Sequence, residues 1–178
     1  MNIRVVSGDI ADAQADAICT STNPRLSLMM GTGGSVRDRG GFEISRACEA
    51  ILDRAAERTG RRALPPGSAV VTIPGRLACR IVIHCVASNL SHASSPEVVA
   101  ACTANALARA AENDCRTVAM PVFASGHARV KFDHAVAAMA GAIAAASASG
   151  FEIRIVVYDA ERVEQARRIL QEHGLTAA

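Results

Sequence analysis

Strand-like and helix-like segments alternate regularly along the second half of this chain, and their order limits the folds open to it. Apolar runs at residues 79–85, 117–121 and 153–158 have the length and composition of buried strands. Each is followed by a segment with apolar residues at helical spacing, opening at the capping residues Ser95, Asp133 and Asp159. Strands joined through helices pair in parallel, with right-handed crossovers. This half therefore predicts a parallel α/β arrangement, with the helix after Asp133 ending near Gly150.

The first half adds shorter strands and one strong helix. Residues 3–6 and 16–20 are β-type runs, and residues 68–73 join residues 79–85 through a Pro-Gly turn, which predicts an antiparallel hairpin. Apolar spacing predicts an amphipathic helix over residues 43–59. The fold class expected is α/β: a three-layer α/β/α sandwich with a mixed, mostly parallel sheet of about six strands and antiparallel edges. Without a linker or internal repeat, residues 1–178 are expected to form a single domain.

Charge and cysteine content narrow the classes of function. The net charge is +2, and the cations are arginines spread along the chain with Lys131 as the only lysine, so a nucleic-acid surface is not expected. The six cysteines form no CxxC pair and no zinc-spaced cluster with histidine, which predicts reduced core thiols and no metal site. No cofactor is expected either. Residues 135–148, the longest apolar stretch, are too short to span a membrane, and Arg4 and Asp9 interrupt any signal-peptide core. We expect a cytoplasmic protein without a membrane partner.

Three loops follow predicted strands at the carboxyl edge of the sheet, where open α/β sheets bind ligands. Asp9, in Gly8-Asp9-Ile10, can accept a hydrogen bond from an exocyclic amine such as adenine N6, although an ordinary turn or cap has the same pattern. The second loop is the segment of residues 20–41, and its glycine-rich part, residues 30–41, contains Gly31-Thr32-Gly33-Gly34-Ser35-Val36. Its N–H groups, or a helix N-terminus just after it, would attract phosphate; the alternative is a flexible surface turn.

The third loop, residues 122–131, carries Ser125-Gly126-His127. It offers a hydroxyl and further N–H groups to the oxygens of a diphosphate. His127 could act as a general acid or base, but no nucleophile pairs with it in the sequence, and a solvated surface histidine is the alternative.

Two other sequence motifs do not indicate a functional site. The glycine segment lacks the spacing of a Rossmann or P-loop site. Cys48 and Arg54 match the C-x5-R spacing of cysteine phosphatases, but they lie inside the predicted helix, where no phosphate-cradling loop can form between them. We interpret this match as coincidence.

Taken in order, these segments resemble a macro domain from about Ile3 to Leu170. Val6-Ser7-Gly8-Asp9-Ile10, followed by Ala15-Asp16-Ala17-Ile18, is similar to the family's opening G-D-I and D-A-I/V, and Thr20-Ser21-Thr22-Asn23 takes the place of its N-A-A-N. Pro66-Gly67-Ser68-Ala69 and Ile81-Val82-Ile83-His84-Cys85 resemble its G-x-A and V-I-H segments, and residues 120–126 resemble F-P-x-I-x-T/S-G. Gly33-Gly34-Ser35-Val36 and Gly40-Gly41-Phe42-Glu43 are most similar to the macro domain of the large histone variant.

The resemblance implies an ADP-ribose site. It implies that Asp9 binds the adenine amine with backbone support from Ile10, that Asn23 lies near the distal ribose, and that two N–H-rich segments wrap the diphosphate. The full set of ligand-binding residues it implies is Asp9, Ile10, Thr20, Asn23, Gly33, Gly34, Ser35, Val36, Ser125, Gly126, His127, Ala128, Arg129 and Tyr158.

The chain departs from the family where catalysis is expected. Thr20 replaces the first Asn of N-A-A-N, on which many family hydrolases rely, and Gly33 and Arg37 replace an Asp and a His. Ala128-Arg129 stands where the family has an aromatic residue followed by Gly. Val163 stands where the family has the aromatic residue that stacks on adenine, and Tyr158 lies just before it. Arg129 would either clamp a phosphate or block the site.

The resemblance and its departures favour a module that binds ADP-ribose or an ADP-ribosylated macromolecule. The alternative is an ADP-ribosyl hydrolase or an O-acetyl-ADP-ribose deacetylase with a non-standard catalytic site. The sequence does not identify a catalytic residue. Nucleic acid is expected as a partner only when it is a modified substrate.

Overall fold

The sheet is mixed and mostly parallel, as the sequence predicts. The computed structural model describes residues 2–146 and 150–178. Its six-stranded sheet has the order β1-β6-β5-β2-β4-β3, with β1 (Asn2–Ser7), β2 (Ala17–Thr22), β3 (Ala69–Thr72), β4 (Ile81–Val86), β5 (Thr117–Pro121) and β6 (Glu152–Val157). β3 pairs antiparallel with β4, which confirms the hairpin, whereas the other edge strand, β1, runs parallel to β6. The expectation of antiparallel pairing at both edges was therefore wrong for β1.

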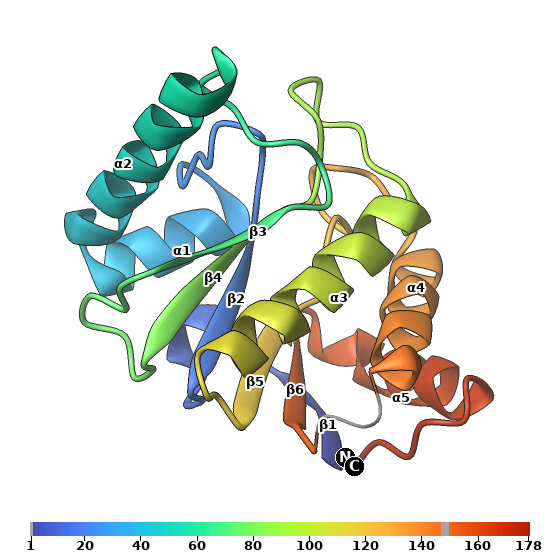
Figure 1. Cartoon of the computed structure of the whole chain (residues 1–178). Coiled ribbons are helices and arrows are strands. Elements are labelled where there is room, and N and C mark those ends of the chain that lie inside the picture. The colour runs from blue at the N-terminus through green and yellow to red at the C-terminus, as the bar shows by residue number, and fades with distance from the viewer. Residues whose placement is uncertain (1, 147–149) are drawn as a thin grey trace.

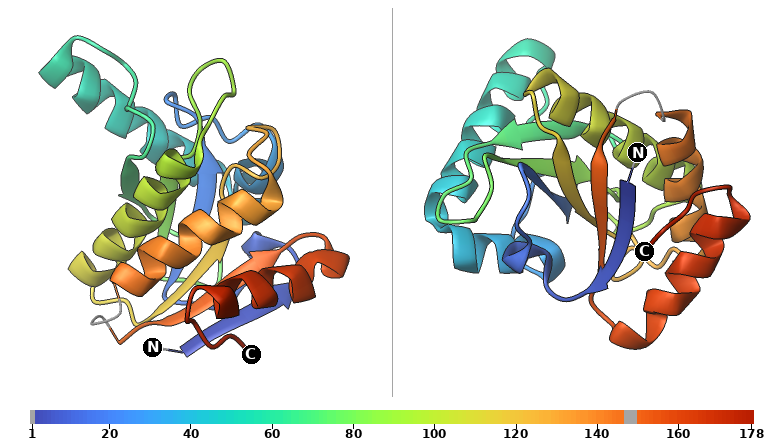
Figure 2. Two further views of the ribbon diagram at one scale, coloured as in Figure 1. Left: turned by 90° about the vertical axis from the view of Figure 1, so that its right-hand side faces the viewer. Right: turned by 90° about the horizontal axis from the view of Figure 1, so that it is seen from below.

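Helices cover both faces of this sheet (Figures 1 and 2). On one face lie α1 (Gly31–Gly40) and α2 (Phe42–Thr59), and on the other α3 (Pro96–Glu112), α4 (Phe132–Ala145) and α5 (Val163–Glu172). Two buried clusters separate the layers. Ile18, Val82 and Ala119 pack against α1 and α2, while Cys19 and Ile83, on the opposite face, pack against the other helices. The three-layer α/β/α sandwich is confirmed.

Of the three capping residues that the sequence predicts for α-helices, one caps its helix directly. Ser95 caps α3 as expected, since its Oγ accepts a hydrogen bond from Val98 N at 3.4 Å. Asp133 lies inside the first turn of α4 rather than before it, and Asp159 caps a short 3₁₀ helix (Ala160–Arg162) that precedes α5. α4 ends at Ala145; its expected continuation toward Gly150 crosses residues 147–149, which lie outside the described residues.

The glycine-rich segment expected to be a loop is helix α1. Low helix propensity predicts a loop there, but packing overrides it. Val36 is fully buried among the residues of α2 and the sheet. A Cβ at Gly33 would meet Leu28 Cα at 3.2 Å, so the missing side chain lets the helix lie close to the preceding loop. The helix therefore starts earlier than the sequence indicated and brings its N-terminus to the sheet edge.

The chain end pairs with the first strand. Val5 N donates to Ala178 O at 2.9 Å, Ala178 N donates to Ile3 O at 3.0 Å, and Ala177 forms a parallel bridge with Ile3. This short segment covers the exposed edge of β1 and brings both termini together at the amino ends of the strands (Figure 1). Among the described residues, no helix is long and apolar enough to cross a membrane.

Candidate functional site

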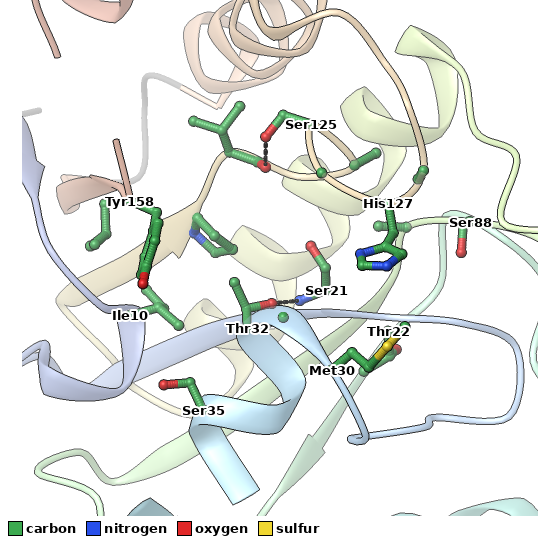
Figure 3. A pocket seen from close by; sticks show the side chains of 18 of the residues that line it. Ile10, Ser21, Thr22, Met30, Thr32, Ser35, Ser88, Ser125, His127 and Tyr158 are labelled. Carbon is green, nitrogen blue, oxygen red and sulfur yellow. Dashed lines mark hydrogen bonds between the residues drawn. The ribbon is translucent and has the colours of Figure 1, made fainter. Parts of the chain in front are cut away.

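A cavity of about 680 Å³ opens at the carboxyl ends of the strands (Figure 3). Its walls come from the segments after β1, β2, β4, β5 and β6 and from the first turns of α1 and α4. β5 and β2 are neighbours in the sheet, and the chain leaves β5 through α4 toward β6 on one side but leaves β2 through α1 and α2 toward β3 and β4 on the other. Such a switch in strand order leaves a crevice in which α/β proteins bind ligands. The cavity has the size of a small-molecule site.

Asp9 stands at one end of the cavity in a fixed orientation. It caps the 3₁₀ helix Ile10–Asp12, with Oδ1 accepting from Ala11 N at 2.9 Å, and Oδ2 accepts from Ser35 Oγ of α1 at 2.5 Å. The Arg39 guanidinium lies 3.6 Å from Oδ2. Each carboxylate oxygen can accept two hydrogen bonds, so both keep capacity for a ligand donor. Tyr158 is 87 % exposed and lies beside Ile10 at this end (Figure 3).

The first turn of α1 forms part of the cavity wall. Gly31 has φ +57°, and Met30, the N-cap, gives no side-chain cap. The N–H groups of Gly31, Thr32 and Gly33 have no acceptor among the described residues. Thr32 Oγ1 accepts hydrogen bonds from Thr20 Oγ1 at 3.0 Å and from Ser21 N at 3.1 Å, which ties the helix start to β2. A helix N-terminus with free N–H groups favours an anion.

The loop after β5 provides the opposing wall. It is closed by hydrogen bonds from Arg129 N to Gly126 O at 3.0 Å and from Val130 N to Ala124 O at 3.1 Å, and Ala124 has φ +59°. Ser125 Oγ donates to Val122 O at 2.9 Å (Figure 3). Within the described chain, the four N–H groups from Ser125 to Ala128 have no acceptor. A run of free N–H groups is a concave site for an anion.

Polar side chains from the segments after β2, β4 and β5 complete the cavity lining, and two of them are histidines. Asn23 Oδ1 accepts from Arg25 N at 3.0 Å and from Ser27 N at 3.3 Å, so this oxygen serves the turn and the amide NH₂ faces no described acceptor. Ser88 and His92, from the segment after β4, line the cavity together with His127. Figure 3 places His127 and Ser88 at the end opposite Ile10 and Tyr158.

The structure brings most of the expected site residues into the cavity. Those that line it are Asp9, Ile10, Asn23, Ser35, Ser125, Gly126, His127, Ala128 and Tyr158. Thr20 is fully buried beneath Thr32, Val36 belongs to the core, and Gly33 and Gly34 pack against the loop before α1. Arg129 does not line this cavity and therefore does not block it; it lines a second hollow. Val163 packs against the core cluster instead of the cavity.

Sequence reasoning missed two parts of the wall. Ser88 and His92 follow β4, a strand whose carboxyl end meets the same sheet edge, so the rule used for the other loops could have found them. Phe132 is the first residue of α4 and Arg162 is the last residue of the 3₁₀ helix before α5, and no local motif marks them. Among the described residues, no group of three or more His, Cys, Asp or Glu side chains is placed to hold a metal ion.

Fold and site together define a class of α/β protein with a cavity at the carboxyl edge of its sheet. Backbone N–H groups line the walls of this cavity, and the carboxylate of Asp9 lies at one end. The family model for the macro domain matches residues 19–139, and the chain belongs to the macro domain family. It is 34 % identical over 165 residues to a macro domain-containing protein of Streptomyces coelicolor, covering 91 % of this chain and 94 % of the relative. It is 31 % identical over 184 residues to an O-acetyl-ADP-ribose deacetylase of an Enterobacter species, covering 98 % and 96 %.

The fold is also similar to that of the Oceanobacillus iheyensis macrodomain solved with ADP. The TM-score is 0.79, the sequence identity 24 %, and the match covers 95 % of this chain and 87 % of that one. At this identity the likeness supports the architecture alone.

Proposed function

We propose that the cavity binds ADP-ribose, free or attached to a modified macromolecule. The observation that carries this proposal is the presence of two facing sets of free N–H groups. Three of these groups belong to the start of α1 and four to the loop after β5, and Asp9 lies beyond them. Two unpaired N–H rows on opposite walls suit a diphosphate. The relatives agree with this ligand class, since one is named for O-acetyl-ADP-ribose and one was solved with ADP.

The two ends of the cavity suit the two ends of this ligand. Asp9 would accept the exocyclic amine of adenine, with Ile10 and the exposed ring of Tyr158 against the base. Asn23 would contact the distal ribose through its free NH₂ group. Ser35 holds the Asp9 carboxylate, so its role toward the ligand is indirect.

The first experiment measures ADP-ribose affinity by titration calorimetry for the wild type and for Asp9→Asn. The substitution removes the carboxylate charge. It also places an NH₂ group at the position that the adenine amine, itself a hydrogen-bond donor, must approach. Loss of a charge-assisted hydrogen bond costs about 1.5–3 kcal/mol, so the affinity should fall roughly ten- to a hundredfold.

Asp12→Asn is the matched control for this substitution. Asp12 lies in the same 3₁₀ helix and pairs with Arg39, but it does not line the cavity. Its affinity should stay close to that of the wild type. A wild type that takes up no ADP-ribose would overturn the proposed function, and equal affinities for both variants would remove Asp9 from the site.

Hydrolysis of an ADP-ribosyl ester or of O-acetyl-ADP-ribose is the second candidate. It is favoured by His127 and Ser88 at the end of the cavity opposite Ile10 and Tyr158, by His92 in the same lining, and by the relative named as a deacetylase. Thr20 is buried and cannot reach a ligand, so a base would have to come from these histidines and lie within about 2.6–3.2 Å of its proton. Release of ADP-ribose or acetate by the wild type, abolished in His127→Ala, would establish this activity over simple binding.

The setting of the module is part of the same proposal. Residues 1–178 would act as one binding module in the cytoplasm, where the six free cysteines stay reduced. The similarity of Gly33-Gly34-Ser35-Val36 to the macro domain of the large histone variant is part of this proposal.

A further inference from the structure

A second hollow lies beside the main cavity and is not used by the proposed contacts to ADP-ribose. It is lined by Ser125, Arg129, Val130, Lys131, Phe132, Asp133, Arg162 and Gln165. Ser125, Phe132 and Arg162 line both spaces, so the two adjoin at these residues. A ligand in the cavity therefore lies directly beside the hollow.

The hollow is strongly cationic for a chain of low net charge. Arg129, Lys131 and Arg162 face it, against the single carboxylate of Asp133. Lys131 is the only lysine of the whole chain. Among the described residues, the side chains of Arg129 and Lys131 have no hydrogen-bond or ion-pair partner. Two unpaired cations at one hollow leave their charge for an anion from outside.

The third cation is held in place by its neighbours. The Arg162 guanidinium lies 5.1 Å from the centre of the Phe132 ring and 3.3 Å from Asp159 Oδ2. Phe132 begins α4, whose N-cap residue Lys131 provides no side-chain cap. The helix start adds positive potential to that of the side chains.

The position of the hollow indicates which part of the ligand would reach it. Its residues follow β5 and β6, and in the sheet β6 lies next to β1, whose following segment carries Asp9. Asn23, Ser88 and His92 follow β2 and β4, toward the other side of the sheet. The hollow is thus on the adenine side of the diphosphate cradle. In ADP-ribose, the group between adenine and the diphosphate is the adenosine ribose.

We propose that this hollow binds a further phosphate carried by the adenosine ribose, so that the preferred ligand is a 2′-phosphorylated ADP-ribose. This inference rests on the proposed function, because it uses the ADP-ribose orientation given above. Arg129 and Lys131 would contact the phosphate, and Arg162 would close the hollow toward the cavity. A continuous nucleic-acid strand is a poorer occupant, since the unpaired cations are confined to one hollow and do not form a stripe.

The test compares the affinities of ADP-ribose and 2′-phospho-ADP-ribose for the same full chain by titration calorimetry, at low and at physiological ionic strength. Exposed ion pairs are individually weak, so the additional phosphate, held by two of them, should tighten binding about five- to tenfold at low salt. The gain should shrink as salt rises.

Two double variants separate this site from general charge effects. In Arg129→Gln/Lys131→Gln the ratio of the two affinities should fall to about one, since the phosphate then lacks its two partners. The control, Arg58→Gln/Arg61→Gln, removes the same charge from exposed residues at the end of α2, outside both spaces, and should keep the wild-type ratio.

The outcomes also separate this inference from the proposed function. Equal wild-type affinities for the two ligands would overturn the phosphate site and leave ADP-ribose binding intact. The same gain in the Arg129/Lys131 double variant as in the wild type would overturn it as well. A wild type that binds neither ligand would overturn the proposed function, and the phosphate site with it.

Discussion

At the scale of single residues, His84 is the buried group that links stability to pH. It lies in β4, fully buried, with Nε2 2.8 Å from Thr72 Oγ1 and 3.7 Å from Cys48 Sγ. Burial lowers the pKa of His84 to about 3, because the charged imidazolium would lose its hydration. The folded protein therefore keeps His84 neutral over the whole physiological range.

We predict that stability falls as the pH drops from about 7.5 to about 5, by roughly 2 kcal/mol in the free energy of unfolding. In this window the unfolded state binds a proton at His84, with its ordinary pKa of 6.5, and the folded state does not. The contribution is present above the unfolded pKa and is lost progressively toward the folded one. Urea denaturation at several pH values measures the effect.

Asp16 does not contribute to this pH dependence. Hydrogen bonds from Arg116 N and Thr117 N hold the pKa of Asp16 below its usual value, so Asp16 titrates below the window. His84→Gln, which cannot be protonated, should flatten the curve. A wild type whose free energy of unfolding stays constant between these pH values contradicts a buried neutral His84.

The same neighbourhood explains why the C-x5-R match has no chemical meaning. Cys48 lies inside α2 and is buried, and burial raises the pKa of its thiol to about 12. A nucleophilic cysteine needs a lowered pKa and access to substrate. Cys48 has neither, as the helical periodicity of residues 43–59 predicted.

At the scale of elements, the predictions were good where hydrophobic pattern decides and poor where packing decides. The strands were placed within one or two residues because buried apolar runs are visible in the sequence. Helix α1 was missed because its glycines suggest a loop, and its stability comes from Val36 in the core and from the close approach of Gly33 to Leu28. These are contacts between distant parts of the chain, which no local rule shows.

Part of the cavity lining was predictable in the same way. Asp9, Ser125 and their neighbours line the cavity because they directly follow strands that the sequence predicts. Thr20 was expected to bind the ligand because of its position in the motif. Its hydroxyl group is instead buried and donates a hydrogen bond to Thr32 Oγ1. Arg129 was expected near the diphosphate, but the hydrogen bond from its N–H to Gly126 O and its φ of +59° turn the chain toward the second hollow.

The two N–H-bearing elements should make the diphosphate the main source of affinity. We predict that ADP binds at least about tenfold more tightly than adenosine, with AMP between them, because each charge-assisted hydrogen bond contributes about 1.5–3 kcal/mol. Competition against a fluorescent ADP-ribose derivative measures the series. Equal affinities for adenosine and ADP would show that neither the start of α1 nor the loop after β5 holds phosphate.

At the scale of the whole molecule, the C-terminal segment completes the edge of the sheet. Leu175 and Ala177 are buried against the cluster on the α3, α4 and α5 face, and Ala178 bonds to β1. We predict that removing residues 175–178 lowers the free energy of unfolding by about 2–4 kcal/mol, the burial of Leu175 being the largest part. The melting temperature measures the loss.

The ligand affinity of this truncated chain should remain that of the wild type, because the segment lies at the amino ends of the strands. Thr176→Ala is the control, since Thr176 is exposed and its change should leave both quantities unaltered. A truncated chain that melts with the wild type would mean that the segment adds nothing to the edge of β1.

Because Ile3 pairs with Ala177, the two chain ends lie side by side, and this determines where another protein or a surface can be attached. With both ends leaving from the base of the sheet, a fused partner or a surface tether attached at either terminus points away from the ligand opening. Immobilised copies would therefore all present their openings outward, and a short peptide joining the two ends would allow new ends to be cut into an exposed turn elsewhere without touching the binding walls.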